Sequence, residues 1–292
     1  MAISRSRRIT AQNTSIPTYV FPHTVTNTIT PVTPTAPVSI NLGAAVTHVT
    51  PIDLVAAFKP KRAGKNPKLS HIVFVLDESS SMSSCYDQTI AGYNEYLKAQ
   101  KEDAQKTGIQ TLVSLFKFNG FNVDCIFDRQ DVQEVTPLTK SNYRPSGGTN
   151  LHDAMGGVMM KINSLLAEKK KADRESVIIT VLTDGEENQS RAFSSTDIKG
   201  MVEKAEGKNW GFMFLGANID AFHAGSALGF NTNNTMQFST TNTAETMRGA
   251  SAMTSRMKGA YASGMATMDS YTASAFTDAE RSSAAGDKDA GK

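Results

Sequence analysis

Five polar side chains carry the kinds of oxygen atom that bind a divalent cation. They comprise two carboxylates and three hydroxyls, carried by Asp77, Ser79, Ser81, Thr149 and Asp184. Oxygen atoms of these kinds are the ligands that a hard cation such as Mg²⁺ prefers. Two carboxylates balance the charge of one such ion, and the set pairs no nucleophile with a general base. The pattern therefore indicates binding rather than catalysis.

Two apolar runs must position these side chains. Residues 71–76 and 177–183 are apolar without alternation, which is typical of buried parallel strands, and each run leads into one of the two carboxylates. In an open α/β sheet, ligands bind at the carboxyl ends of the strands. Thr149 precedes a helix that apolar residues at helical spacing predict over 150–169. The five side chains are therefore expected to meet at one edge of a sheet.

Each of these residues also has a simpler interpretation when it is taken alone. An Asp or Ser after a strand can cap the following helix, and Thr149 can be the N-cap of the helix that it precedes. Asp184-Gly185 can be only a turn. These alternatives stay open for single residues, whereas the five residues taken together favour a metal site.

The pattern Asp77-x-Ser79-x-Ser81, followed by Thr149 and by Asp184 in Thr-Asp-Gly, resembles the metal-ion-dependent adhesion site of von Willebrand factor A-type domains. The resemblance covers roughly residues 70–240 and implies a doubly wound, mostly parallel sheet with one antiparallel edge strand. It implies a non-enzymatic domain that binds Mg²⁺, with Mn²⁺ or Ca²⁺ as alternatives. The three hydroxyls would be direct ligands, and the two carboxylates would bind directly or through water. An acidic side chain of a partner protein would take an open coordination position.

Other ionisable side chains receive smaller roles. Three acids are expected beside the site, where they could tune its charge without being ligands: Glu78, Glu186 and Glu187. His152 is expected on the surface at the start of its helix. The histidines and cysteines of the chain lack the spacing of a zinc site.

The remaining segments agree with a repeating β/α fold. Strands predicted at 109–118 and 122–127 flank Asn119-Gly120, a strong signal for a tight antiparallel turn. Further strands are predicted at 210–218 and 235–239. Helices are predicted over 84–102, 195–206, 221–228 and 243–262.

Four parts are expected along the chain. Residues 1–58 are rich in Thr, Pro and Val, and no Asp, Glu, Lys or Arg lies between Arg8 and Asp53. This part is either a disordered tail or an extended arm that pairs with a sheet edge. Residues 59–69 predict a solvated basic linker, with a phosphate-binding patch as the alternative. The A-type domain follows at 70–242. A helical extension follows at 243–292, and its last residues, 282–292, are expected to be a soluble tail.

Composition narrows the partners and the location. Thirty basic and 28 acidic residues give a net charge of +2, which offers no reason to expect nucleic acid as the main partner. No apolar run reaches the ~18 residues that span a bilayer. The N-terminal arginines are not followed by the apolar region of a secretory signal. We expect residence in a cytoplasm, or in a virus particle assembled there.

Two alternative functions follow from other parts of the chain. The neutral arm and the Ala-, Ser- and Met-rich C-terminal region suggest a structural component of a large assembly such as a virus particle, anchored or self-assembled through the arm. Intracellular members of the resembled family suggest an adaptor for an AAA+ ATPase.

Overall fold

The fold is organised around strand β1 (Leu69–Asp77), in which residues 70–77 are all buried. In the computed structural model, which describes residues 55–217 and 219–286, β1 bonds to a parallel neighbour on each side. A strand covered on both faces has no polar side to present, which explains its apolar run without alternation. The predicted arm lies outside the described residues except for its last few positions.

Six strands form one mixed sheet in the order β3-β2-β1-β4-β5-β6. The hairpin predicted around Asn119-Gly120 is present, and its second strand, β3, is the antiparallel edge of an otherwise parallel sheet. This architecture confirms the predicted doubly wound α/β fold. The other strands are β2 (Gln110–Phe118), β3 (Val123–Asp131), β4 (Ser176–Thr183), β5 (Trp210–Ala217) and β6 (Thr235–Phe238).

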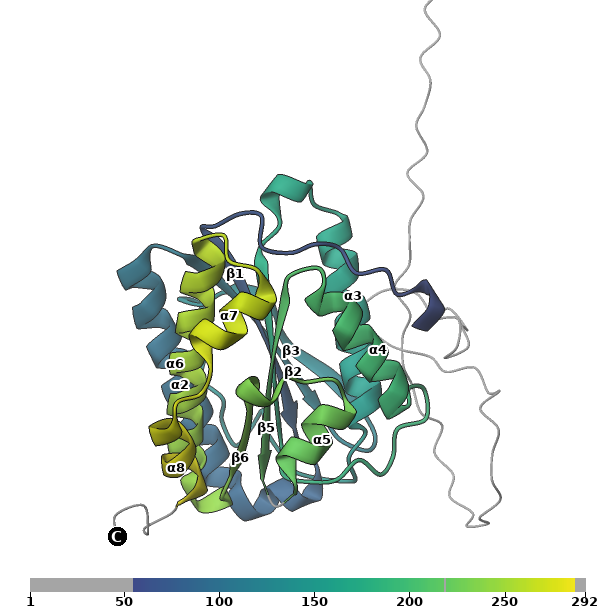
Figure 1. Cartoon of the computed structure of the whole chain (residues 1–292). Coiled ribbons are helices and arrows are strands. Elements are labelled where there is room, and N and C mark those ends of the chain that lie inside the picture. The colour runs from purple at the N-terminus through teal and green to yellow at the C-terminus, as the bar shows by residue number, and fades with distance from the viewer. Residues whose placement is uncertain (1–54, 218, 287–292) are drawn as a thin grey trace, which may run out of the picture.

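Helices cover both faces of the sheet (Figure 1). One layer contains α3 (Leu151–Ala167), α4 (Ser195–Glu206) and α5 (Ala221–Ala227). The other contains α2 (Tyr86–Thr107), α6 (Thr243–Ala262), α7 (Thr267–Ser274) and α8 (Asp278–Ala285). Each layer buries its own apolar core against the sheet. Among the described residues, no helix combines the length and the apolarity needed to cross a membrane.

Helix α6 is held to α2 by a buried polar network. The Lys258 ammonium lies 2.6 Å from a carboxylate oxygen of Asp103, 3.0 Å from Gln100 Oε1 and 3.1 Å from Thr111 Oγ1. Lys258 is 1% exposed, so these partners replace the water that its charge has lost. The helix predicted over 243–262 is therefore an integral layer of the domain, whereas the sequence placed it in an extension.

The chain remains structured beyond the point where a soluble tail was expected. Helix α8 begins with a capping box formed by Thr277 and Glu280. The Glu280 carboxylate accepts two hydrogen bonds from Arg256 of α6, both of 2.9 Å. Ala284 is fully buried, and its carbonyl accepts from the Ser239 amide. Residues 282–285 thus belong to the packed domain, which corrects the expectation of a tail from residue 282.

Residues 55–68, named the strap here, lie along the domain as a fixed segment. Phe58 and Ala63 are buried, and the Phe58 ring meets the Trp210 ring edge-on with centroids 6.3 Å apart. The Trp210 indole donates a 2.8 Å hydrogen bond to the Lys61 carbonyl. A solvated linker was expected in most of this segment. Its backbone instead bonds to the domain, and the exposed parts of the strap are mainly its charged side chains.

Replacing Phe58 by Ala should destabilise the folded protein by about 3 kcal/mol, because a buried aromatic ring leaves a cavity against Trp210. Urea denaturation of the full chain measures the change in the free energy of unfolding. Phe121→Ala is the matched control, since that ring is 51% exposed and its loss should cost less than about 1 kcal/mol. Equal losses in the two variants would show that the strap does not contribute to the fold.

Candidate metal centre

The five predicted residues meet at the carboxyl ends of β1 and β4. These strands are neighbours, and the chain leaves β1 toward α2 on one face and β4 toward α4 on the other. Such a switch point opens a crevice between the two connections, where ligands of open α/β sheets bind. Asp77 is the last residue of β1, and Asp184 directly follows β4.

The three hydroxyl groups converge on one small space beside Gly185. A Cβ atom on Gly185 would lie 3.2 Å from Ser81 Oγ, 3.2 Å from Thr149 Oγ1 and 4.0 Å from Ser79 Oγ. Ser79 Oγ and Ser81 Oγ are 3.0 Å apart. The lack of a side chain at Gly185 therefore leaves room where the three oxygen atoms face each other. Sequence reasoning assigned this glycine only to a turn.

Asp77 is held in a fixed orientation by its neighbours. Its carboxylate accepts a 2.7 Å hydrogen bond from the Ser79 amide and a 2.6 Å bond from Thr183 Oγ1. The Tyr143 hydroxyl donates to the Asp77 carbonyl at 2.8 Å. Burial raises the pKa of Asp77 to about 6, because desolvation outweighs these hydrogen bonds. Sequence reasoning missed Thr183 and Tyr143; the first stands beside Asp184, and no pattern indicates the second.

Asp184 has one oxygen in use and one without a protein partner. Asp184 Oδ1 accepts a 2.6 Å hydrogen bond from Ser81, whereas Oδ2 is buried with no hydrogen-bond partner. Burial also raises the pKa of this carboxyl. Within the described chain, neither Asp77 nor Asp184 is in an ion pair. Two buried carboxylates without a cation, one of them with a free oxygen, fit a bound divalent ion.

The donor set is dominated by hydroxyls. No group of three or more His, Cys, Asp or Glu side chains that could hold a metal occurs in the part of the chain that the structure describes. Neutral hydroxyls with only two carboxylates suit Mg²⁺ or Mn²⁺ better than a soft metal that requires sulfur or nitrogen.

Thr149 is positioned by reciprocal bonds between two loops. Its amide donates to Asn188 Oδ1 at 3.0 Å, and its carbonyl accepts from the amides of Asn188 and Gln189. The preceding turn requires a glycine at 147, where φ is +74° and a Cβ would lie 2.5 Å from the Phe121 ring. The loop after β4 therefore fixes both Asp184 and Thr149.

The acids beside the site have different surroundings. Glu78 is buried and lies 2.7 Å from the Lys117 ammonium, and it also accepts from the Arg144 amide. Its charge is thus compensated, which makes it part of the scaffold rather than a group that tunes the site. Glu186 is exposed. Glu187 accepts hydrogen bonds within its own loop.

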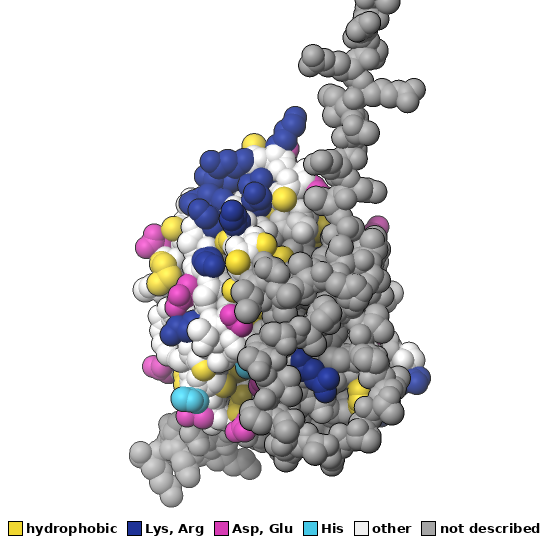
Figure 2. All heavy atoms as spheres, turned by 90° about the vertical axis from the view of Figure 1, so that its right-hand side faces the viewer, with side chains coloured by type: hydrophobic (Ala, Val, Ile, Leu, Met, Phe, Trp, Pro, Cys, Tyr) yellow, Lys and Arg dark blue, Asp and Glu magenta, His cyan; other side chains and the backbone are white. Residues whose placement is uncertain are grey.

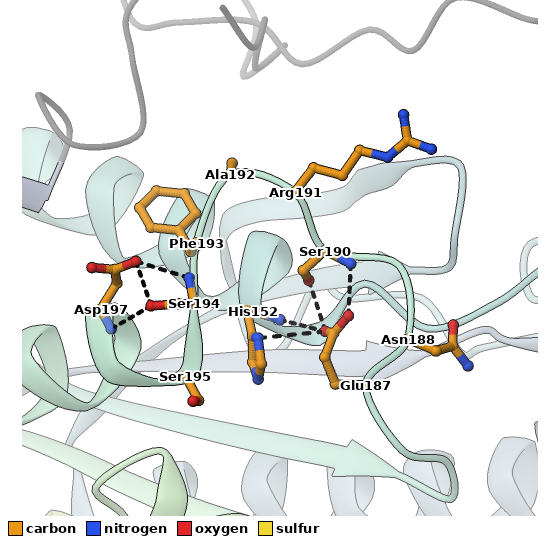
Figure 3. Close-up of a pocket in the computed structure, with 10 residues that line it drawn as sticks. All are labelled: His152, Glu187, Asn188, Ser190, Arg191, Ala192, Phe193, Ser194, Ser195 and Asp197. Carbon is orange, nitrogen blue, oxygen red and sulfur yellow. Dashed lines mark hydrogen bonds and ion pairs between the residues drawn. The ribbon is translucent and has the colours of Figure 1, made fainter. Parts of the chain in front are cut away.

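A cavity of about 480 Å³ lies next to this loop (Figure 3). The Glu187 carboxylate accepts from the His152 amide at 3.0 Å and from Ser190 Oγ at 2.7 Å. On the opposite wall, Asp197 forms a capping box with Ser194 at the start of α4. His152 is half-buried rather than on the open surface, and burial lowers its pKa. These carboxylates therefore stabilise the loop and the helix that surround the cavity.

Several solved structures are similar to this chain. Proximal thread matrix protein 1 from the mussel byssus has 13% identity and a TM-score of 0.43, covering 65% of this chain and 46% of that protein. The SpRpn10 VWA domain has 8% identity and a TM-score of 0.38, covering 59% of this chain and 87% of that domain. Manganese-loaded Plasmodium vivax TRAP protein has 14% identity and a TM-score of 0.41, covering 61% of this chain and 72% of that protein. The chain thus spans less than half of the mussel protein.

Sequence comparisons identify the family. No curated protein matches this chain. The family model of the von Willebrand factor type A domain matches residues 71–254, which include all five residues of the candidate site and most of α6. This match covers more than half of the 292 residues, and it agrees with the strand order and the two helical layers. The chain belongs to the von Willebrand factor type A domain family.

Proposed function

We propose that this chain is a non-enzymatic protein-binding module whose partner docks through a divalent metal ion. Domains of this family generally mediate interactions between proteins. The metal would be Mg²⁺, with Mn²⁺ and Ca²⁺ as alternatives, held by the residues of a metal-ion-dependent adhesion site: Asp77, Ser79, Ser81, Thr149 and Asp184. The partner would supply an acidic side chain.

One observation carries the proposal. Three hydroxyl oxygens face one space beside Gly185, and a buried oxygen of Asp184 at the same place lacks any hydrogen-bond partner. A buried carboxylate oxygen without a hydrogen-bond partner costs free energy, because it has lost water and gained nothing in its place. A cation at this position would remove that cost and would bring the hydroxyls into use.

The carboxylates and the hydroxyls of the site would have different roles in binding the metal. Two carboxylates balance a divalent charge, and the uncharged hydroxyls add ligands without adding negative charge. A metal held in this way supplies an electrophilic position that attracts a carboxylate. Ser81 is the exposed member of the set, whereas Asp77 and Thr149 are buried, so the site opens to solvent on the Ser81 side. The bonds to Thr183 and Asn188 hold Asp77 and Thr149 in place before any partner arrives.

Mg²⁺ should stabilise the wild-type chain, and Asp184→Ala should abolish this effect. At a Mg²⁺ concentration about 100 times the Kd, the gain is about 2.7 kcal/mol. Thermal unfolding with and without EDTA, together with calorimetric titration of Mg²⁺, measures the effect. Glu186→Ala is the control, because it removes an exposed carboxylate two residues away that the site does not include. A wild-type chain that does not bind Mg²⁺, Mn²⁺ or Ca²⁺ would refute the metal site.

Gly185→Ala tests the convergence of the hydroxyls without removing a donor. The added methyl group would lie 3.2 Å from both Ser81 Oγ and Thr149 Oγ1, so it should weaken Mg²⁺ binding by on the order of tenfold or more. The same titration measures the change in Kd. An unchanged Kd with an intact fold would place the metal elsewhere.

The docking role has a separate test with a protein partner. The wild-type chain should retain the partner in Mg²⁺ and release it in EDTA, and Asp184→Ala should not retain it.

Asp77→Asn should stabilise the metal-free protein at neutral pH. Because the pKa of Asp77 is raised from 3.8 to about 6, the folded state holds the proton more tightly than the unfolded state, and stability falls as pH rises between these values. The neutral amide avoids this loss, so the variant should gain about 1–3 kcal/mol in EDTA at about pH 7.5.

The gain of Asp77→Asn should shrink at about pH 4, where the wild-type carboxyl is itself protonated. Urea denaturation at both pH values measures the difference. Glu186→Gln, which changes an exposed carboxylate, should show little difference at either pH. A variant that is less stable than the wild type at neutral pH in EDTA would contradict the assigned cost of burying Asp77.

A further inference from the structure

A dense basic patch covers the end of the molecule opposite the candidate metal centre. It is formed by three parts of the chain, which are residues 59–68, residues 168–175 and the single residue Lys208. They contain ten Lys and Arg residues and three Asp and Glu residues, a net charge of +7 in a chain whose total is +2. Figure 2 shows Lys and Arg side chains gathered at the upper end of the face on view. The near-neutral total thus conceals a strongly asymmetric distribution.

Backbone hydrogen bonds bring the three segments together. The Gly64 amide donates to the Glu175 carbonyl at 2.7 Å, and the Lys65 amide donates to the Arg174 carbonyl at 3.0 Å. The Ala63 amide donates to the Lys208 carbonyl at 2.8 Å. The segments precede β1, β4 and β5, which are adjacent in the sheet, so its topology places their charges side by side.

The nearby acids do not neutralise the exposed lysines. Glu175 is buried, and its carboxylate pairs with Lys169 at 2.8 Å and with Arg129 at 2.6 Å. Glu168 and Asp173 are the other two acids of the patch. Seven exposed lysines of the patch have no ion pair within the described residues: Lys59, Lys61, Lys65, Lys68, Lys170, Lys171 and Lys208. Their charges repel one another and favour a polyanionic ligand.

We infer that the basic patch binds the phosphate backbone of a nucleic acid without reading its bases. Phosphates at regular spacing match several lysines at once, and binding releases the condensed counterions. The exposed large apolar side chains of the described chain are Phe121, Phe222 and Met268, all outside the patch. No aromatic ring is therefore available there for base stacking, and no apolar side chain for insertion into a membrane. Lysine is also depleted at protein–protein interfaces.

This inference departs from the expectation drawn from net charge. The sequence offered a phosphate-binding patch only as the alternative to a solvated linker at 59–69. The fixed strap favours the phosphate-binding patch over the solvated linker, because it adds five basic residues to those of 168–175 on one rigid surface. The patch and the metal centre lie at opposite ends of β1, about 30 Å apart for a strand of nine residues. The two sites are therefore independent of each other.

The test uses the full chain with short fluorescent duplexes of DNA and of RNA, in two unrelated sequences and in the presence of EDTA. Fluorescence anisotropy should show binding to DNA, RNA or both, with a Kd that does not depend on sequence. Lys65→Glu, Lys68→Glu and Lys171→Glu combined should raise the Kd at least tenfold. The slope of log K against log salt concentration, between about 50 and 200 mM, should become shallower by about 2–3.

The matched control reverses three exposed lysines elsewhere on the molecule, with Lys98→Glu, Lys140→Glu and Lys199→Glu combined. It makes the same change in total charge and should leave the Kd within about threefold of the wild type. An equal loss of duplex affinity in both triple variants would show that binding depends on total charge, and it would overturn the proposal that the basic patch binds nucleic acid. Circular dichroism confirms that both variants are folded.

Two further results would overturn the nucleic-acid assignment. The first is binding to vesicles containing phosphatidylserine, or to polyglutamate, with no binding to either duplex. The second is no binding to the duplexes at about 50 mM salt, where non-specific contacts are strongest. Because Asp184→Ala and EDTA leave the patch intact, neither should change duplex binding. A failure of the metal proposal is thus distinguishable from a failure of this one.

Discussion

The burial of a carboxylate at the end of the central strand is the constraint on which the site depends. Because β1 is bonded on both edges and covered on both faces, Asp77 leaves the sheet in surroundings almost free of water. A charge there requires hydrogen bonds or a counter-charge. The Ser79 amide and the Thr183 hydroxyl supply the first. No cation among the described residues pairs with Asp77 or Asp184, and one buried oxygen of Asp184 accepts no hydrogen bond.

The sequence predicted the features that depend on local pattern and on the general geometry of parallel sheets. Runs 71–76 and 177–183 are apolar because β1 and β4 are covered on both sides, so their type and their ends could be predicted from composition. Once two parallel strands end in acids, the topology alone places those acids together. The same reasoning accounts for Thr149, which lies two residues before the first residue of α3, Leu151.

The features that were missed depend on contacts between distant parts of the chain. Residues 59–68 of the strap were taken for a solvated linker because their composition is basic and interrupted by prolines. Trp210, which packs against Phe58 of the strap, lies 149 residues beyond Lys61. The environment of Glu78 depends on Lys117 of the neighbouring strand. Helices α7 and α8 have eight residues each, too few to be stable without the packing that holds them.

Parallel pairing along the whole of β1 has a mechanical consequence. Every residue from Leu69 to Asp77 is in register with β2, and Ser70 to Leu76 are also in register with β4. A force applied between the two ends of this strand would act along its axis and load both ladders in shear. The hydrogen bonds would then have to break together instead of one after another. A molecule held at the two ends of β1 would therefore resist extension more strongly than one pulled at an edge strand.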